Sequence, residues 1–562
     1  MEFKIEEILE CIYESLGYKG YNIVSPSSRV ELCDYQINTC FSISKSFHIS
    51  PTVIGEKIVN EIKLLDNFND YFKSVEFFAP GFINITVSDK FICDNNMLLI
   101  NDLGISKNNS QKYFLDYGGA NVAKPLHIGH IRPAIIGESL KRILKLKGNT
   151  TISDVHLGDY GLQIGEVIFS CIRDKKQVED ITLEYLSIVY PLISAECKDN
   201  EETLNVCKNI TLELQLGNQK YQEYFKKICD VSIKDIKEIY DYLGVSFDLW
   251  LGESDSYDVI PELISILEGK GLVSLSEGAK VINIKKLSDT KEYPPLILQK
   301  SDNAYLYATT DLACVLDRKN KYNPDYILYV VDARQSLHFE QVFRVCEMSG
   351  ISKSTSLEHI AFGTINGLDG KPFKTRSGET LKLRELFSLV REEFISKREE
   401  NKNLSEKDLD IIVNSIIKFA DLQNNREKNY IFDISKFSDV SGKTGPYIEY
   451  TALRIRKILN ENKPINDNLG SFIENKYERD LRIKLFEFDK VLNNAVEERS
   501  PHFIAEYVYN LCNLVNSFYE NNRISTLEDE VLKSSWINLL ALCYKYIEVS
   551  LELLLIDIPS KM

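Results

Sequence analysis

The spacing of apolar residues predicts a small mixed α/β domain over residues 1–108. Apolar positions recur at helical spacing over residues 51–62. Residues 75–78 and 82–87 are rich in β-branched and aromatic residues and flank the turn Ala79-Pro80-Gly81, which is typical of two consecutive strands.

The pattern changes to alternating strands and helices over residues 109–384. Residues 112–117 are β-rich, a Gly-containing loop follows, and residues 131–147 carry apolar side chains on one helical face. Residues 326–331 are a continuous apolar run, as expected for a buried parallel strand. This alternation predicts a Rossmann-like, doubly wound sheet.

The remaining segments are helical in pattern. Residues of about 165–230 are charged and helix-rich, and we interpret them as an insertion. Residues 385–440 form an expected helical connection, and residues 441–562 an all-helical domain. The fold class expected is therefore multidomain, α/β followed by all-α, in keeping with a length of 562 residues.

Composition excludes some classes of protein. The chain lacks a run of about 18 apolar residues, and its first residues are acidic where a secretory signal carries bases. Its 12 cysteines form no Cys-x-x-Cys pair, so we expect free thiols, no bound zinc and a cytoplasmic location. A net charge of −16 argues only weakly against a nucleic-acid partner, since the local field matters.

The segment Asn121-Val122-Ala123-Lys124-Pro125-Leu126-His127-Ile128-Gly129-His130 carries the clearest chemistry. It lies between an expected strand and helix, where a doubly wound fold binds ligands and where a helix N-terminus favours phosphate. Two imidazoles three residues apart can stabilise charge on one phosphate. A chance pair of surface histidines is the less favoured alternative.

A second segment, Gly370-Lys371-Pro372-Phe373-Lys374-Thr375-Arg376-Ser377-Gly378, places three cations within six residues. Such a loop suits a polyphosphate, although a solvated turn is the favoured explanation when the loop is taken alone.

Together these segments resemble the two signatures of class I aminoacyl-tRNA synthetases. His127 to His130 match the His-Ile-Gly-His element, and the second loop is a divergent Lys-Met-Ser-Lys-Ser counterpart. Further stretches are similar to the arginyl branch. They are Leu157-Gly158-Asp159-Tyr160-Gly161-Leu162-Gln163-Ile164-Gly165, Gly252-Glu253-Ser254, Tyr305 to Ala313, Tyr329 to Phe339, Thr444 to Tyr450 and the final Pro559-Ser560-Lys561-Met562.

The resemblance implies a two-step reaction. Arginine attacks the α-phosphate of ATP, brought as its Mg²⁺ complex, and the arginyl group then passes to the terminal 2′-hydroxyl of tRNA-Arg. His127, Gly129 and His130 would hold ATP. Lys124 would compensate for a lysine that the loop lacks, and Lys374 and Arg376 would add charge from the loop.

Arginine itself needs carboxylates for its planar guanidinium. The resemblance assigns this role to Tyr307 and Asp311, one helical turn apart, with Asp116 as a second carboxylate. Asn121 and Gln335 would hold the amino-acid end. A core tyrosine and a helix-capping aspartate are the structural alternatives.

For tRNA, the resemblance points to Asn38 and Phe82 in the N-terminal domain, which in this family contacts the D-loop. Tyr447, Tyr450 and Trp536 are candidates for the anticodon loop, with roles in the hydrophobic core as the alternative. The family also implies a monomer with no membrane attachment. Gly118-Gly119-Ala120 replaces the usual Ser-Ser-Pro before Asn121, so we expect a looser backbone there.

Other classes fit less well. A nucleotidylyltransferase of the same superfamily would be shorter and would lack the helical tail. A non-catalytic tRNA-binding paralogue would be expected to have lost Lys124, His127, His130 or Asp311. A synthetase for a small apolar amino acid would need a β-rich editing domain, for which there is no room.

Overall fold

The computed structural model describes residues 1–562 except 28, 30, 108–109, 302–303, 374–379 and 465–468. Its chain forms two compact units. The first comprises residues 1–106, 448–494 and 506–551, and the second comprises residues 107–447, 495–505 and 552–562. In both units the described helices are too short or too polar to cross a membrane.

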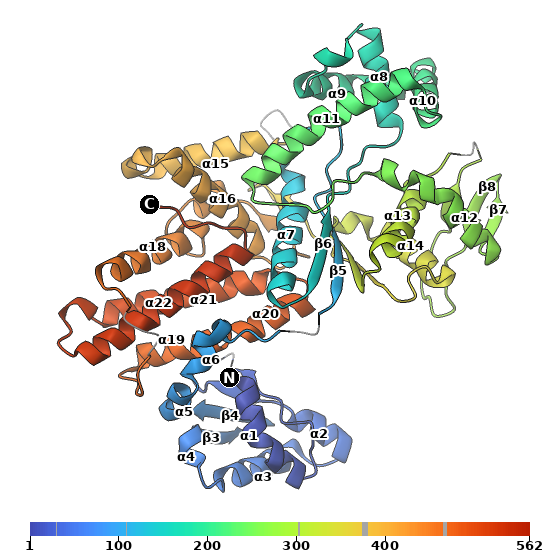
Figure 1. The fold of residues 1–562 in the computed structure, drawn as a ribbon. Helices are drawn as coiled ribbons and strands as arrows, with labels where there is room; N and C mark the ends of the chain where they lie inside the picture. The colour runs from blue at the N-terminus through green and yellow to red at the C-terminus, as the bar shows by residue number, and fades with distance from the viewer. Residues whose placement is uncertain (28, 30, 108–109, 302–303, 374–379, 465–468) are drawn as a thin grey trace. The chain divides into compact units, whose positions relative to one another are not determined.

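The N-terminal part of the first unit is a four-stranded antiparallel sheet in the order β1-β2-β4-β3, with helices packed on it (Figure 1). Its elements are α1 (Glu2–Ser15), β1 (Ser25–Pro26), β2 (Tyr35–Ile37), α2 (Cys40–Phe47), α3 (Pro51–Lys63), α4 (Phe68–Tyr71), β3 (Phe72–Phe78), β4 (Phe82–Val87), α5 (Asp89–Asp94) and α6 (Asn96–Ile100). The predicted helix and both predicted strands are present.

The rest of the first unit is helical. It draws on α18 (Gly445–Glu461), α19 (Lys476–Phe486), α20 (Phe488–Glu497), α21 (His502–Asn521) and α22 (Glu530–Leu553). Arg479 on α19 joins these helices to the N-terminal sheet, because its guanidinium bonds both carboxylate oxygens of Asp34 at 2.8 and 2.7 Å. The N-terminal domain and the C-terminal helices thus form a single packed body.

The second unit is built on a parallel sheet in the order β11-β10-β5-β6. Its first half contains β5 (Lys112–Asp116), α7 (Ile131–Leu146), β6 (Thr150–Asp154), α8 (Leu162–Arg173), α9 (Leu183–Asp199), α10 (Glu201–Gln215), α11 (Gln219–Tyr242) and α12 (Ile260–Gly269). Helices α8 to α11 gather at one end of the unit, as Figure 1 shows, and contain the predicted insertion.

The second half of this unit continues the sheet and adds short strands and helices. It contains β7 (Val273–Ser276), β8 (Ala279–Ile282), β9 (Leu296–Gln299), α13 (Tyr307–Tyr322), β10 (Tyr326–Tyr329), α14 (Ser336–Ser349), β11 (Ser356–His359), β12 (Ile365–Asn366), α15 (Leu383–Lys397), α16 (Glu406–Leu422), β13 (Tyr430–Ile431) and α17 (Ile434–Phe437). β7, β8 and β9 form a separate antiparallel sheet.

The strand order creates a topological switch point between β5 and β10. The chain runs from β5 through α7 to β6 on one side, whereas β10 lies on the other side of β5, with Asp116 opposite Tyr329. In such sheets ligands bind beyond the carboxyl ends of the two strands at this point. The predicted signature follows β5, and Gln335 follows β10.

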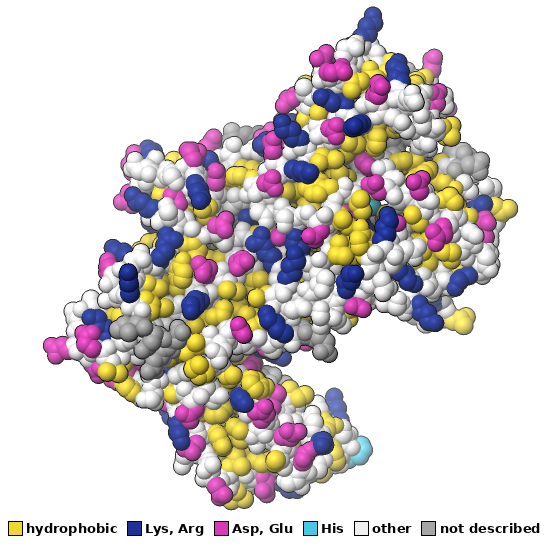
Figure 2. Space-filling view, in the orientation of Figure 1, with side chains coloured by type: hydrophobic (Ala, Val, Ile, Leu, Met, Phe, Trp, Pro, Cys, Tyr) yellow, Lys and Arg dark blue, Asp and Glu magenta, His cyan; other side chains and the backbone are white. Residues whose placement is uncertain are grey.

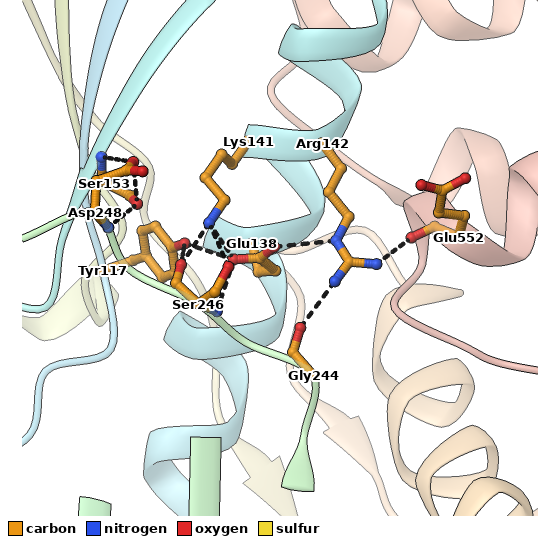
Figure 3. A network of polar contacts seen from close by, with 9 residues as sticks. All are labelled: Tyr117, Glu138, Lys141, Arg142, Ser153, Gly244, Ser246, Asp248 and Glu552. Carbon is orange, nitrogen blue, oxygen red and sulfur yellow. Dashed lines mark hydrogen bonds and ion pairs between the residues drawn. The ribbon is translucent and has the colours of Figure 1, made fainter. Parts of the chain in front are cut away.

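Helix α7 is buried along most of its length, so its polar residues need partners inside the fold. The carboxylate of Glu138 receives Lys141 at 2.6 Å, Arg142 at 3.0 Å and the Tyr117 hydroxyl at 2.8 Å (Figure 3). Arg142 also donates to the carbonyl oxygens of Gly244 and Glu552. Charged groups thus fix α7 to the strand before the signature, to the segment after α11 and to the C-terminal tail.

The tail, residues 552–562, is held to the second unit at further points. The Ser139 hydroxyl on α7 donates to the Leu553 carbonyl at 2.7 Å, and the Lys418 ammonium donates to that of Leu555 at 2.6 Å. Ser560 donates its N–H to the Asp408 carboxylate at 2.6 Å. The end of the chain is therefore part of the framework around α7.

Candidate active site

The backbone before the signature turns at two glycines. Gly118 and Gly119 both have positive φ, +106° and +63°, a conformation that glycine adopts without a Cβ clash. The Tyr240 hydroxyl donates to the Gly118 carbonyl at 3.0 Å, and a Cβ on Gly118 would approach that hydroxyl to 3.1 Å. The two glycines thus allow a turn that Tyr240 contacts, and the expectation of a looser backbone there stays a prediction.

The next residues are supported by the loop after β6 and by helix α11. Val122 donates its N–H to the Gly158 carbonyl at 3.1 Å, and a Cβ on Gly158 would collide with the Asn121 side chain. Ala123 has φ +62°, and its N–H donates to the Ser232 hydroxyl on α11 at 2.9 Å. Asn121 and Lys124 therefore lie on a turn that is hydrogen-bonded to the loop after β6 and to α11.

The two signature histidines form a reciprocal cap at the start of α7. Gly129 donates its N–H to His127 Nδ1 and His127 donates its N–H to His130 Nδ1, both at 3.1 Å, and the rings lie 4.0 Å apart. Because His127 Nδ1 accepts from Gly129, a neutral His127 ring carries its proton on Nε2. His130 Nδ1 also lies 3.2 Å from the His127 carbonyl oxygen, so its role in the cap follows the tautomer of that ring. A Cβ on Gly129 would meet the His127 ring at 2.9 Å, so this glycine also makes room for the imidazole.

Both imidazoles are held neutral. Burial, and then the charge of Lys124, lowers the pKa of His127. Burial, followed by the neighbouring His127, lowers the pKa of His130 to about 3. At neutral pH the pair is therefore uncharged rather than doubly positive, and the His127 Nε2–H can donate to a phosphate.

The second predicted signature is only partly described. Lys374 and Arg376 lie outside the described residues. The segment that follows them pairs with the first signature, because Ile128 donates to the Leu381 carbonyl at 2.9 Å and Leu383 to that of Leu126 at 3.0 Å. The segment Leu381-Lys382-Leu383 therefore lies beside His127, and Lys382, which faces His127 in this pairing, is exposed.

Tyr307 and Asp311 lie one turn apart in the first half of α13, as their spacing predicts. The Asp311 carboxylate contacts His338 Nε2 at 2.5 Å, and Tyr307 is 64% exposed, so it remains accessible to a ligand. Gln335 is exposed just before α14, on the crossover that follows β10.

Asp116 is less accessible than its proposed role suggests. Its carboxylate is buried at the end of β5 and pairs with Arg318 at 2.7 Å. Arg318 also reaches Asp154 at 3.0 Å. Burial raises the pKa of Asp116, and the guanidinium of Arg318 opposes that shift. Arg318 therefore competes with any substrate for this carboxylate, whose role in arginine binding stays a prediction.

The structure adds Glu253, a carboxylate that the sequence argument had not assigned to the site. Burial raises the pKa of Glu253 to about 7; the nearby His156 opposes this shift, and Asp311 and Asp159 add to it. Glu253 in turn contributes to the raised pKa of Tyr307, after burial. Glu253 therefore influences, or is influenced by, both Tyr307 and Asp311 electrostatically, although it lies more than 50 residues before them in the sequence. The Gly252-Glu253-Ser254 stretch was a recognisable signal, but only the fold connects it to α13.

The predicted tRNA residues differ in their surroundings. Asn38 is exposed, Tyr447 is half-buried, and Phe82 is half-buried with its ring against Phe41 at 5.2 Å. Trp536 is only 4% exposed, and its indole N–H donates to the buried Glu478 at 3.0 Å. The prediction that Trp536 contacts tRNA is not supported, because its apolar ring is used in the helical core.

Aromatic and basic side chains that are more exposed than Trp536 lie on α18 and α21. The Arg454 guanidinium lies 5.8 Å from the ring centre of Tyr450 and 5.0 Å from that of Tyr519. Both rings are exposed, at 42% and 38%. Figure 2 shows acidic and basic side chains interspersed on the visible face, so the net charge of −16 does not form one repulsive field there.

Comparison with known proteins agrees with this fold. The family model described as "tRNA synthetases class I (R), catalytic domain" matches residues 95–434. The "Arginyl tRNA synthetase N terminal domain" matches residues 4–87, and the "DALR anticodon binding domain" matches residues 448–562. The catalytic unit is thus that of a class I aminoacyl-tRNA synthetase.

Relatives that match the chain over its length identify the branch of this class to which it belongs. The chain is 38% identical to the arginine–tRNA ligase of Agathobacter rectalis, with 99% of each chain covered, and 38% identical to that of Alkaliphilus oremlandii, with 100% of each covered. The arginyl-tRNA synthetase of Plasmodium falciparum has the same fold, with a TM-score of 0.83, 24% identity and coverage of 100% of this chain and 99% of that one. This chain belongs to the arginyl-tRNA synthetase family, the arginine–tRNA ligases.

Proposed function

We propose that this chain activates L-arginine with ATP and transfers the arginyl group to the terminal adenosine of tRNA-Arg. The observation that carries the proposal is the position of two neutral histidines at the switch point of the sheet, in the same catalytic unit as the cluster of Glu253, Tyr307 and Asp311. The histidine pair suits a phosphate, and the cluster of Glu253, Tyr307 and Asp311 suits a guanidinium.

In the first step, a carboxylate oxygen of arginine attacks the α-phosphorus, the new O–P bond forms, and pyrophosphate leaves. His127 and His130 donate Nε2–H bonds to the α-phosphate oxygens as charge develops on them. Mg²⁺ enters with ATP and neutralises phosphate charge. In the second step the 2′-hydroxyl of tRNA attacks the arginyl carbonyl and AMP leaves.

Arginine selection follows from the acidic cluster. A guanidinium presents five N–H donors in a planar fork, which suits carboxylates that approach from two sides. Asp311 and Glu253 supply the carboxylates and Tyr307 an aromatic face and a hydroxyl. Lysine is rejected because one ammonium leaves buried acceptors unpaired. Asn121 and Gln335 remain the proposed contacts of the amino-acid end.

The tRNA contacts proposed are Asn38 and Phe82 for the elbow, and Tyr447 with the Tyr450–Arg454–Tyr519 group for the anticodon loop. An opened loop exposes base faces, and aromatic and guanidinium planes stack on them. We propose a cytoplasmic monomer.

The direct test is arginine-dependent exchange of radiolabelled pyrophosphate into ATP, with and without tRNA-Arg. We expect exchange with arginine but not with lysine or citrulline. Citrulline matches arginine in shape but carries no charge, so it isolates the role of the carboxylates. tRNA binding without exchange for any amino acid would favour a non-catalytic tRNA-binding paralogue.

The raised pKa of Glu253, about 7, makes arginine binding pH-dependent. Because Glu253 pairs with a guanidinium only when ionised, we expect the KM for arginine to fall by up to about tenfold between pH 6 and 8. The folded state should also lose stability as pH rises from the ordinary pKa of a glutamate through about 7, since folding favours the protonated form.

The measurement is the KM for arginine in the exchange reaction across this pH range. Glu253→Gln should show a higher KM that no longer changes with pH. An unchanged slope in this variant would assign the titration to another group.

A further inference from the structure

Helix α9 of the helical insertion places an aromatic ring against the signature lysine. The Lys124 ammonium lies 4.5 Å from the ring centre of Tyr190 on α9. Tyr190 itself is half-buried and packs on the core cluster that holds Val122 and Ala123, the two residues before Lys124. The ring is thus fixed by the same packing that fixes the turn.

Lys124 lies within the electrostatic environment of the site. Its charge contributes to the lowered pKa values of His127 and His130, in each case after burial. It also opposes the rise that burial gives to the pKa of Glu166 on α8. The Lys124 ammonium therefore acts electrostatically on both histidines and on Glu166 of the insertion.

The kind of contact matters for the chemistry. A lysine side chain has four flexible bonds, so its ammonium must be confined to act at one place. A carboxylate partner would occupy some of its N–H donors and partly neutralise its charge. A ring face attracts the cation through its quadrupole and requires no hydrogen bond. The N–H groups of Lys124 remain available for phosphate oxygens while the side chain is confined.

Tyr190 also connects to the arginine side of the site. Its hydroxyl contributes to the raised pKa of Tyr307, after burial and Glu253. Through Tyr190 the insertion thus contacts Lys124 and also raises the pKa of Tyr307.

We propose that Tyr190 is a positioning residue that confines the Lys124 ammonium at the ATP phosphates, so that the helical insertion is part of the activation machinery. This inference rests on the proposed function and adds to it a residue outside both signatures.

The test is pyrophosphate exchange by purified full-length variants. We expect Tyr190→Phe, which keeps the ring, to behave like the wild type. Tyr190→Leu, which keeps an apolar side chain but not the ring, should lose about threefold to tenfold in kcat/KM for ATP. The KM for arginine in this variant should change much less.

A double-mutant cycle separates positioning from a purely structural effect. Lys124→Met combined with Tyr190→Leu should be no slower than Lys124→Met alone, because the ring then has no cation to confine. Tyr185→Leu is the matched control. Tyr185 lies on the same helix and makes the same kind of contact with Lys176, at 5.0 Å, and its loss should leave exchange unchanged.

Additive losses in the cycle, an equal loss in Tyr185→Leu, or a loss in Tyr190→Phe as large as in Tyr190→Leu would each overturn the proposal. A wild-type protein without exchange would instead overturn the proposed function. The two failures are therefore distinguishable.

Discussion

Replacing His127 with alanine is expected to lower kcat for arginine activation by about a hundredfold to a thousandfold. The hydrogen bond from Gly129 to Nδ1 leaves the Nε2–H of His127 free to donate to the α-phosphate. Because charge on those oxygens grows as the O–P bond forms, the donor contributes more in the transition state than in the ground state. The KM values for ATP and arginine should change much less than kcat.

Single-turnover formation of arginyl-adenylate measures this effect without product release. His127→Asn is the matched control, since its amide keeps an N–H donor and should recover part of the rate. Thermal unfolding of both variants checks that the cap at the start of α7 survives. Equal rates for alanine and wild type would show that the imidazole does not act on the reacting phosphate.

Replacing Asp311 with asparagine is expected to reduce kcat/KM for arginine by about a hundredfold to a thousandfold, with little change in the KM for ATP. The substitution keeps the size and the contact with His338 but removes the charge opposite the guanidinium. The remaining carboxylate, Glu253, has a pKa of about 7 and is only partly ionised at neutral pH. It cannot replace the loss fully.

Initial rates of exchange at varied arginine concentration give this value. Asp317→Asn is the matched control, because Asp317 lies on the same helix and pairs with Lys321 at 2.9 Å away from the pocket. A similar loss in both variants would indicate damage to α13 rather than loss of a substrate contact.

The sequence predicted those parts of the site that lie within one continuous segment. The signature from Asn121 to His130 and the helix after it follow from local pattern, as does the one-turn spacing of Tyr307 and Asp311. Local spacing fixes these because a helix or a cap involves only near neighbours.

Contacts between distant segments could not be predicted in the same way. Glu253 acts on Tyr307 only in the folded chain. Tyr190, which contacts Lys124, comes from a helix without a recognisable motif. Nothing in the sequence indicated that the indole N–H of Trp536 donates to the buried carboxylate of Glu478. Each of these depends on tertiary packing, which composition and periodicity do not encode.

The glycines before Asn121 illustrate a different limit. Small residues were interpreted as freedom of the backbone, and Gly118 and Gly119 occupy positive φ in a turn that Tyr240 contacts. Glycine removes a steric barrier and does not by itself make a segment mobile.

The attachment of the C-terminal tail to α7 constrains how parts of this chain can be exchanged with those of relatives. The bonds from Arg142 to Glu552 and from Ser139 to Leu553 place the last residues in the catalytic unit, although the family model for anticodon binding extends over them. A chimera that takes residues 448–562 from another species as one cassette replaces the helices matched by that family model and also this support of α7. A chimera that retains the native residues 495–505 and 552–562 leaves the second unit unchanged. Any change in its tRNA preference can then be separated from a change in catalysis.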